Sequence, residues 1–431
     1  MNEGIVRWMS IGMALILSAS GLVACGARPA APVAKAEVLQ SDKPRLPAPE
    51  LGEARVTELV AGNIQFAFDL YHLLFSTRNN LFCSPYSISL ALAMTYTGAR
   101  GETERQMAQA LRFALLQEAL HPAFNALDQA LANRGEKDKD EEAFRLHIVN
   151  ALWGQSGYSF LSAFLDLLAQ NYGAGLRVLD FQAAPEDSRV AINKWVGDQT
   201  EEKIKDLLPT GSISPNTRLV LTNAIYFKAA WMHPFNEDQT RDGTFHLLDG
   251  SQVTVPMMEQ SERLGYGQGD GYQVVELPYA GGELSMVILL PATGHFEDFA
   301  SSLDAQRLSA ILEGIQWEEV HLTMPKFSYD AGFQLKDALL RLGMTDAFSD
   351  GADFSGMDGT RNLFISDVYH KAFVAVDEAG TEAAAATAVV MNLTAAPMMP
   401  QEVRVDRPFI FLIRDIETGT ILFLGHVVNP A

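Results

Sequence analysis

Hydrophobic residues recur at helical spacing in the N-terminal third of the chain. Between residues 57 and 75 the apolar positions lie three or four residues apart, which indicates one face of an α-helix. A second helix is predicted to start at Ser84, because serine is a favoured N-cap and the proline that follows suits the first helical position. This helix continues to about Gly98, and a further helical stretch covers residues 117–133.

Short apolar runs in the second half of the chain predict β-strands. They cover residues 219–228, 284–291, 320–325, 409–413 and 421–428. The last two flank a Thr-Gly turn and therefore predict a C-terminal hairpin, while a helix with a glycine stop is predicted over 335–343. Helices and strands interleave without a regular βαβ period, so the pattern predicts a mixed α/β fold.

One stretch near the C-terminus, from Asp377 to Ala388, is almost free of bulky side chains. If it forms a strand, one face carries small or β-branched residues, namely Thr381, Ala383, Ala385, Thr387 and Val389. The other face then carries Gly380, Glu382, Ala384, Ala386 and Ala388, with its one charge directed at water. Such a segment can enter between two existing strands without overpacking the core beneath. Composition alone favours a short helix or a linker, because alanine is the best helix former.

The chain has 431 residues, of which 48% are hydrophobic, so it can bury a large core. Its net charge of −21 argues against nucleic acid or anionic lipid as a partner. No internal repeat and no second linker interrupt residues 54–431, which we expect to form one domain.

The N-terminus has the features of an export signal, which we assign to residues 1–24. Arg7 precedes an apolar run, and that run is short for a membrane span. It ends in Leu-Val-Ala-Cys, which resembles the bacterial lipobox and implies lipidation of Cys25. The alternative is an ordinary cleaved signal peptide with an incidental cysteine.

Residues 25–53 are rich in proline and alanine without hydrophobic periodicity, which predicts a semi-extended tether. A lipidated Cys25 leaves Cys83 as the one other cysteine, so no disulfide is expected within the chain. The tether and anchor together predict a protein held at the cell envelope or surface on its extracytoplasmic side.

Motifs of enzymatic chemistry do not occur in the sequence. There is no Gly-x-Ser-x-Gly, no His-Glu-x-x-His, no cysteine pair at metal spacing and no phosphate-binding loop. We therefore expect no catalytic residue, no metal and no cofactor.

Two motifs carry a resemblance to the serpin family, the serine protease inhibitors. The stretch from Asn80 to Ile88 resembles the family signature Asn-hydrophobic-Phe-Ser-Pro-x-Ser-Ile. The acidic residue 378, followed by a small residue, Gly-Thr-Glu, four alanines and Thr387, resembles the hinge of the family's reactive loop. Similar matches recur in order after residue 55. The resemblance implies the serpin fold, with three β-sheets, eight to nine helices and an exposed reactive-centre loop.

The resemblance assigns roles to individual positions. The hinge comprises Glu378, Gly380, Thr381, Glu382, Ala383, Ala384, Ala385, Ala386 and Thr387. The shutter, where the central sheet opens, comprises Ser84, Ser87, Asn223 and His370. Trp231 and Lys326 lie at the breach, the end of the sheet where the loop enters, and Lys326 is expected to pair with Glu378.

The resemblance further implies a suicide inhibitor of serine proteases, which traps its target after loop cleavage and insertion; some serpins also trap cysteine proteases. Family hinges run about sixteen residues beyond the acidic residue, which places the scissile bond at Thr394–Ala395. Leu393–Thr394 and a bond near Met398 stay open, because the segment that follows is somewhat long. No basic residue lies between Val389 and Pro400, which favours an elastase-like or chymotrypsin-like target over a trypsin-like one.

Other partners follow from the same resemblance. The helical stretch at 117–133 contains no Lys or Arg, which argues against activation by heparin-like polymers, and we expect a monomer. The alternative function is that of a non-inhibitory serpin, serving as a surface binding or structural protein or as a protease decoy. The small residues of the hinge favour the inhibitory function over the non-inhibitory one.

Overall fold

The computed structural model describes residues 35–49, 53–134, 144–381 and 399–431, and these belong to one compact unit. The predicted signal peptide, Cys25, the hinge beyond Thr381 and the scissile bond lie outside the described residues. Within the described part of the chain, no helix is long and apolar enough to cross a membrane.

Ten α-helices occur among the described residues. Their bounds are α1 Glu53–Leu74, α2 Pro85–Tyr96, α3 Gly101–Ala110, α4 Gln117–Ala132, α5 Ser162–Tyr172, α6 Pro185–Gln199, α7 Phe296–Ser302, α8 Ala305–Glu313, α9 Lys336–Arg341 and α10 Ser355–Asp358. The predicted start of α2 is confirmed, because the Ser84 side chain accepts a hydrogen bond from the backbone N–H of Ser87.

Seven strands form the first sheet, in the order β1-β4-β3-β5-β13-β12-β11. Their bounds are β1 Glu37–Leu39, β4 Leu176–Leu179, β3 Phe144–Gln155, β5 Leu219–Ala230, β13 Gly380–Thr381, β12 Ile365–Val376 and β11 Phe327–Gln334. Neighbouring strands are antiparallel except for β3 with β4 and for β5 with β12.

Nine strands form the second sheet, in the order β14-β10-β7-β8-β9-β15-β16-β2, with β6 paired to β7. Their bounds are β14 Gln401–Arg404, β10 Gln316–Pro325, β7 Gln252–Gly269, β8 Tyr272–Pro278, β9 Leu284–Pro291, β15 Phe409–Asp415, β16 Ile421–Val427, β2 Leu81–Cys83 and β6 Arg241–His246. The C-terminal hairpin is thus formed by β15 and β16, as predicted.

The predicted mixed α/β fold is confirmed, with two hydrogen-bonded sheets where three were expected. The reason lies in β7, which pairs with β6 over residues 252–257, with β10 over 257–266 and with β8 over 265–269. One continuous ladder therefore joins β6, β8 and β10 in a single sheet.

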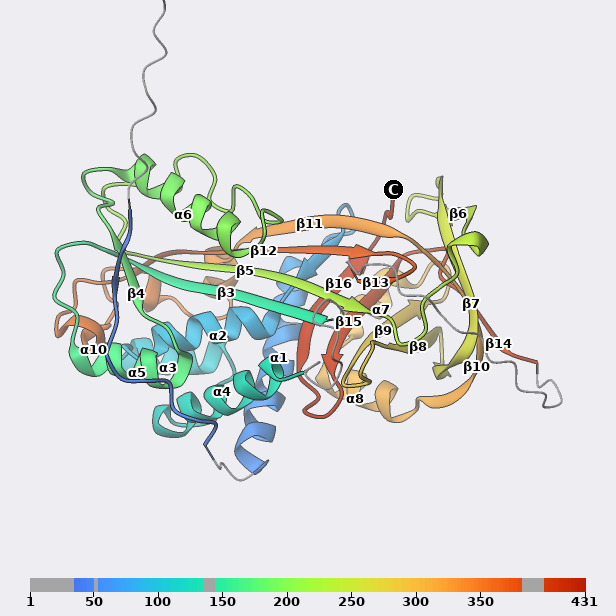
Figure 1. The fold of residues 1–431 in the computed structure, drawn as a ribbon, viewed down its shortest axis with the longest axis horizontal. Helices are drawn as coiled ribbons and strands as arrows, with labels where there is room; N and C mark the ends of the chain where they lie inside the picture. Colours follow the sequence, from blue (N-terminus) through green and yellow to red (C-terminus); the bar gives the residue numbers. More distant parts are fainter. Residues whose placement is uncertain (1–34, 50–52, 135–143, 382–398) are drawn as a thin grey trace, which may run out of the picture. The chain divides into compact units, whose positions relative to one another are not determined.

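Both faces of the seven-stranded sheet are covered (Figure 1). Helix α6 lies over one face, where a small apolar cluster includes Trp153, Ile192 and Val220. Helices α1 to α5 lie on the opposite face, over the main core. Because both faces of the sheet are buried under apolar side chains at β5, the sequence of this strand is nearly continuously hydrophobic.

Residues 35–49, which belong to the stretch predicted to be a semi-extended tether, contact the folded domain. Strand β1 pairs with the edge of β4, and the residues after it pack on α5 and α4. Proline content suggested an extended chain, and the segment is extended, but an unpaired sheet edge gives it hydrogen-bond partners. The compact unit therefore begins about twenty residues earlier than predicted.

Candidate functional site

The candidate site is the junction between β5 and β12 in the seven-stranded sheet. These two strands pair directly over most of their length, from Ile365 opposite Leu219 to Phe373 opposite Tyr226. At the far end of the junction β13 lies between them, with Thr381 opposite Ala229 on one side and Val376 on the other. The first hinge residues thus already occupy the position of a new central strand.

Thr381 points its side chain into the core below the sheet. It is 1% exposed, and its Oγ1 lies 2.7 Å from the hydroxyl of Tyr279. The ring of Tyr279 stacks on that of Trp231 at 4.7 Å between centroids. The inward position of Thr381 agrees with the alternation expected of a strand.

Gly380 allows the hinge to come this close to β5. A Cβ at this position would lie 2.1 Å from the carbonyl oxygen of Ala229, a backbone atom that cannot move aside without breaking the ladder. Only glycine therefore fits at the point where the chain turns into the sheet.

The root of the hinge is held by hydrogen bonds from three directions. Lys326 Nζ lies 2.5 Å from Glu378 Oε2, and the Thr240 hydroxyl donates to Oε1 at 2.7 Å. The indole N–H of Trp231 donates to the Asp377 carbonyl at 3.0 Å, and the Trp231 backbone N–H donates to that of Ala379 at 2.9 Å. Trp231 and Lys326 therefore fix the direction in which the loop leaves the sheet.

The Glu378 carboxylate is nearly enclosed, with a side chain that is 8% exposed. Burial alone raises its pKa, but the hydrogen bonds from Lys326 and Thr240 outweigh burial, so that the net pKa is lowered. The ionised form is thus the stable one in the folded protein. Its contribution to stability is present above the ordinary carboxyl pKa and is lost as the pH falls through the lowered value.

Glu378→Lys is expected to release the hinge root, because it places two ammonium groups side by side at a poorly solvated position. We expect a loss of about 1–3 kcal/mol in the free energy of unfolding and loop–sheet polymers on mild heating. Native gels after incubation at graded temperatures measure the polymers. The double variant Glu378→Lys, Lys326→Glu restores opposite charges and should restore the monomer; polymers at wild-type level in the single variant would show the pair to be incidental.

The predicted shutter residues come together beneath the sheet, and all are fully buried. His370 on β12 bonds through Nδ1 to the side-chain oxygen of Asn223 on β5, and its Nε2 accepts from the backbone N–H of Ser84 at 3.2 Å. These contacts require the neutral imidazole with its proton on Nδ1. The amide nitrogen of Asn223 donates to the Ser87 hydroxyl.

Three functional residues were not identified from the sequence. Asn150 on β3 lies directly opposite Asn223 and accepts a hydrogen bond from its amide, which makes it a shutter member. Its signal was a polar residue inside an apolar strand, the same signal that singled out Asn223. Tyr279 and Thr240 gave no such signal, because tyrosine and threonine are common in ordinary strands.

The shutter predicts a pH dependence of stability. Burial lowers the pKa of His370 from 6.5 to about 3. The histidine therefore binds a proton near pH 6.5 in the unfolded chain but stays neutral in the folded protein. The free energy of unfolding thus falls as the pH drops from about 6.5 towards 3. Burial likewise lowers the pKa of His121 to about 3. Burial is also the largest influence on His426, whose pKa is lowered to about 4.

His370→Gln is expected to reduce the slope of the unfolding free energy against pH between pH 4 and 6. The reduction should reach up to about 1.4 kcal/mol per pH unit, which corresponds to the uptake of one proton on unfolding. Urea unfolding at several pH values measures the slope. His233→Gln, at an exposed position, is the control and should leave the slope unchanged. Equal slopes in wild type and His370→Gln would contradict the neutral buried imidazole.

Comparison with known proteins agrees with this geometry. A family model described as "Serpin (serine protease inhibitor)" matches residues 61–430. An uncharacterised serpin-like protein of Thermococcus kodakarensis is 43% identical, with 88% of each chain covered. Human leukocyte elastase inhibitor is 41% identical over 86% of this chain and all of its own.

Among solved structures, the native state of the thermophilic serpin tengpin matches with a TM-score of 0.81 and 29% identity, over 92% of this chain and all of its own. The family model covers far more than half of the chain, and the relatives cover most of it. The chain therefore belongs to the serpin family of serine protease inhibitors.

Proposed function

We propose that the protein is a suicide inhibitor of serine proteases that acts by cleavage and insertion of its reactive loop. The observation that carries the proposal is the position of β13, whose two residues lie between β5 and β12 as the start of a new strand. The similarity to leukocyte elastase inhibitors supports the same function.

The register of β13 specifies how an inserted loop would lie. Gly380 lies opposite Ala230 and Thr381 opposite Ala229, in antiparallel sense. Continued without a bulge, this register brings Met391 opposite Leu219, at the beginning of β5. Insertion would therefore fill the whole junction and would place Ala383, Ala385, Thr387 and Val389 on the inward face with Thr381.

The two ends of the loop are held in different sheets. Thr381 belongs to the seven-stranded sheet, whereas Gln401 begins β14, which pairs with β10 in the nine-stranded sheet. While the chain between them is intact, it cannot extend along β5 without pulling β14 away. Cleavage within the loop removes this restraint, so the hinge is then free to insert.

Insertion must also break contacts that close the junction. The β5–β12 ladder and the bond from His370 to Asn223 both cross it. Parallel pairs are slightly less stable than antiparallel ones, and an inserted strand antiparallel to both neighbours replaces one ladder by two. This gain is the driving force for translocation.

The protease contributes the first half of its ordinary reaction. Its serine attacks the scissile carbonyl, which we assign to the Thr394–Ala395 bond, and forms an acyl-enzyme. Insertion then moves the attached protease and distorts its active site before water can release it. The target class is elastase-like or chymotrypsin-like, because Val389 to Pro400 contains no basic residue.

The deciding experiment is incubation of the protein with elastase, chymotrypsin, subtilisin and trypsin. We expect an SDS-resistant complex with one or more of the first three and a released C-terminal peptide starting at Ala395, measured by mass spectrometry. Cleavage without any complex would instead support the decoy function, and neither cleavage nor complex would support a binding or structural role.

We further propose that the protein is monomeric and is lipid-anchored through Cys25 on the extracytoplasmic side of the cell envelope. Cys25→Ser should move the protein from the detergent phase to the aqueous phase in a Triton X-114 partition, because it removes the acylated side chain. Cys83→Ser is the control and should leave the partition unchanged. Unchanged partition of Cys25→Ser would reject the anchor.

A further inference from the structure

Residues 37–49 begin with β1, the edge strand of the seven-stranded sheet, and continue onto the helical side of that sheet. Val38 lies opposite Arg177 in an antiparallel pairing of β1 with β4, whose other edge pairs with β3. Figure 1 shows the segment in dark blue, passing β4 and then the helices below the sheet. The pairing makes β1 the outermost strand of the half-sheet β1-β4-β3-β5, which must separate from β12 when the junction opens.

Beyond β1 the segment is bonded first to α5 and then to α4. Ser41 and Lys43 both contact the Asp166 carboxylate, at 2.5 and 2.8 Å. The Leu46 backbone N–H donates to the carbonyl of Gln170 at 2.9 Å, and the Leu46 carbonyl accepts from two α4 side-chain amides at 3.0 and 3.1 Å.

Arg45 provides the least exposed polar contact of the segment. Its Nε donates to Asn125 at 2.8 Å, and its Nη2 lies 2.6 Å from Asp128, with both charged side chains less than a third exposed. The Asp128 carboxylate also accepts from the Tyr86 hydroxyl at 3.4 Å. Charge-assisted bonds in such partly buried surroundings are stronger than bonds at an open surface.

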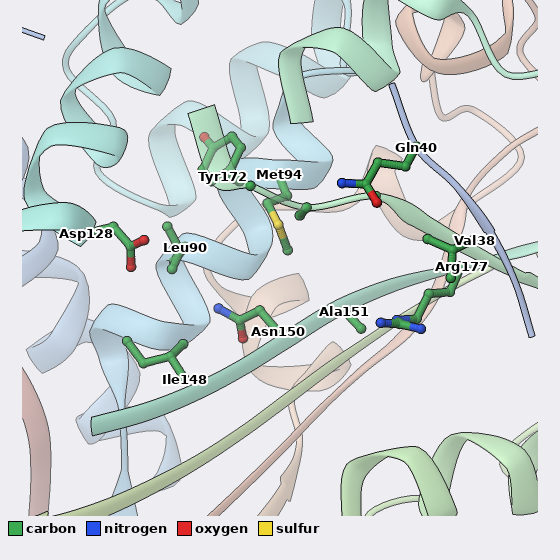
Figure 2. Close-up of a pocket in the computed structure, with 13 residues that line it drawn as sticks. Val38, Gln40, Leu90, Met94, Asp128, Ile148, Asn150, Ala151, Tyr172 and Arg177 are labelled. Carbon is green, nitrogen blue, oxygen red and sulfur yellow. The ribbon is translucent and has the colours of Figure 1, made fainter. Parts of the chain in front are cut away.

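A cavity of about 270 Å³ lies between the segment and the sheet. Val38 and Gln40 of the segment, Leu90 and Met94 of α2 and the shutter residue Asn150 of β3 line it (Figure 2). Within the described part of the chain, no strand pairs with β3 on the β4 side before Leu152. The half-sheet is thus loosely packed here, and the segment bridges the gap.

Helix α4 is in turn fixed to the second sheet. Just after its C-terminus, Arg134 Nε lies 2.7 Å from Asp415, a fully buried carboxylate at the end of β15. The segment therefore connects the outer strand of the half-sheet to a helix that is tied to the rest of the domain. Lateral movement of β4 must stretch or break one of these connections.

We propose that the surface formed by β4, α5 and α4 is a docking site for an extended segment, filled here by residues 37–49, and that its occupancy sets how readily the β5–β12 junction opens. The proposal deepens the insertion mechanism proposed above, on which its functional meaning rests. It adds a restraint that lies on the opposite edge of the sheet from the hinge.

The test uses two full-length variants that weaken docking from opposite sides. Gly175→Val acts from the residue just before β4, because a Cβ there would lie 2.9 Å from the Leu39 carbonyl oxygen. Arg45→Gln acts from the segment, by removing the charge that pairs with Asp128. Asp42→Asn is the matched control, because Asp42 lies in the same segment and its side chain is exposed.

The readout is amide hydrogen exchange in β5 and β12, which reports opening without any protease. We expect at least a fivefold faster exchange at residues 219–226 and 365–373 in Gly175→Val and Arg45→Gln, and no change in Asp42→Asn. A synthetic peptide of residues 35–49 should slow the exchange again in Arg45→Gln but not in Gly175→Val, where the docking site itself is blocked.

The proposal would be overturned if the β1 amides exchanged at the rate of an undocked segment in both variants while the amides of β5 and β12 still exchanged at wild-type rates. The proposed inhibitory function fails by a different result, namely the absence of any protease complex in the wild type. The two failures are therefore distinguishable.

Discussion

Thr381→Arg is expected to be cleaved at the same bond as the wild type and yet to release active protease, with little complex formed. The Thr381 side chain is 1% exposed and contacts Tyr279 beneath the sheet. An arginine there must either bury an unpaired charge, at several kcal/mol, or stay outside and keep the hinge out of the sheet. Cleavage is unaffected, because the scissile bond lies well away from this position.

The size of the effect follows from the competition between insertion and deacylation. A barrier to insertion raised by about 3 kcal/mol slows it roughly a hundredfold. The stoichiometry of inhibition, measured as moles of inhibitor consumed per mole of protease inactivated, should rise accordingly. Glu382→Arg is the control, because the next residue along a strand faces the opposite side; it should inhibit almost normally. Equal trapping by both variants would show that the loop does not act by insertion.

Of the substitutions proposed, Asn223→Ala should cause the largest decrease in the free energy of unfolding, because Asn223 is the residue that joins the other shutter residues. The Asn223 side chain bonds to His370, Ser87 and Asn150, and all these contacts lie under the sheet. Each buried polar group left without a partner costs about 1–3 kcal/mol. We expect a loss of about 3 kcal/mol in the free energy of unfolding, together with faster polymer formation, since the β5–β12 junction loses its cross-link.

Urea unfolding and native gels after mild heating measure these two effects. Asn216→Ala, at an exposed turn before β5, is the matched control and should behave as the wild type. If Asn223→Ala unfolds within 0.5 kcal/mol of Asn216→Ala, a figure typical of neutral surface changes, the shutter does not hold the junction closed.

The sequence alone was sufficient to predict the elements that periodicity and end signals specify. Helix α2 begins where Ser84 and the following proline predict it, and β9 covers Leu284–Pro291 as expected. The family was indicated by the resemblance of residues 80–88 and 378–387 to serpin motifs, and the family model confirmed it. These features are local, so they can be read without knowing which segments meet.

The tertiary structure decided what depends on partners far apart in the chain. That Asn150 joins Asn223 depends on the register of β3 with β5, and that Tyr279 meets Thr381 depends on the stacking of Tyr279 on Trp231. Residues 35–49 carry no hydrophobic period, so their sequence predicted a semi-extended tether without partners in the domain. Their structure comes from backbone hydrogen bonds to the open edge of β4 and from Arg45 meeting Asp128, and neither partner is visible until the domain has folded.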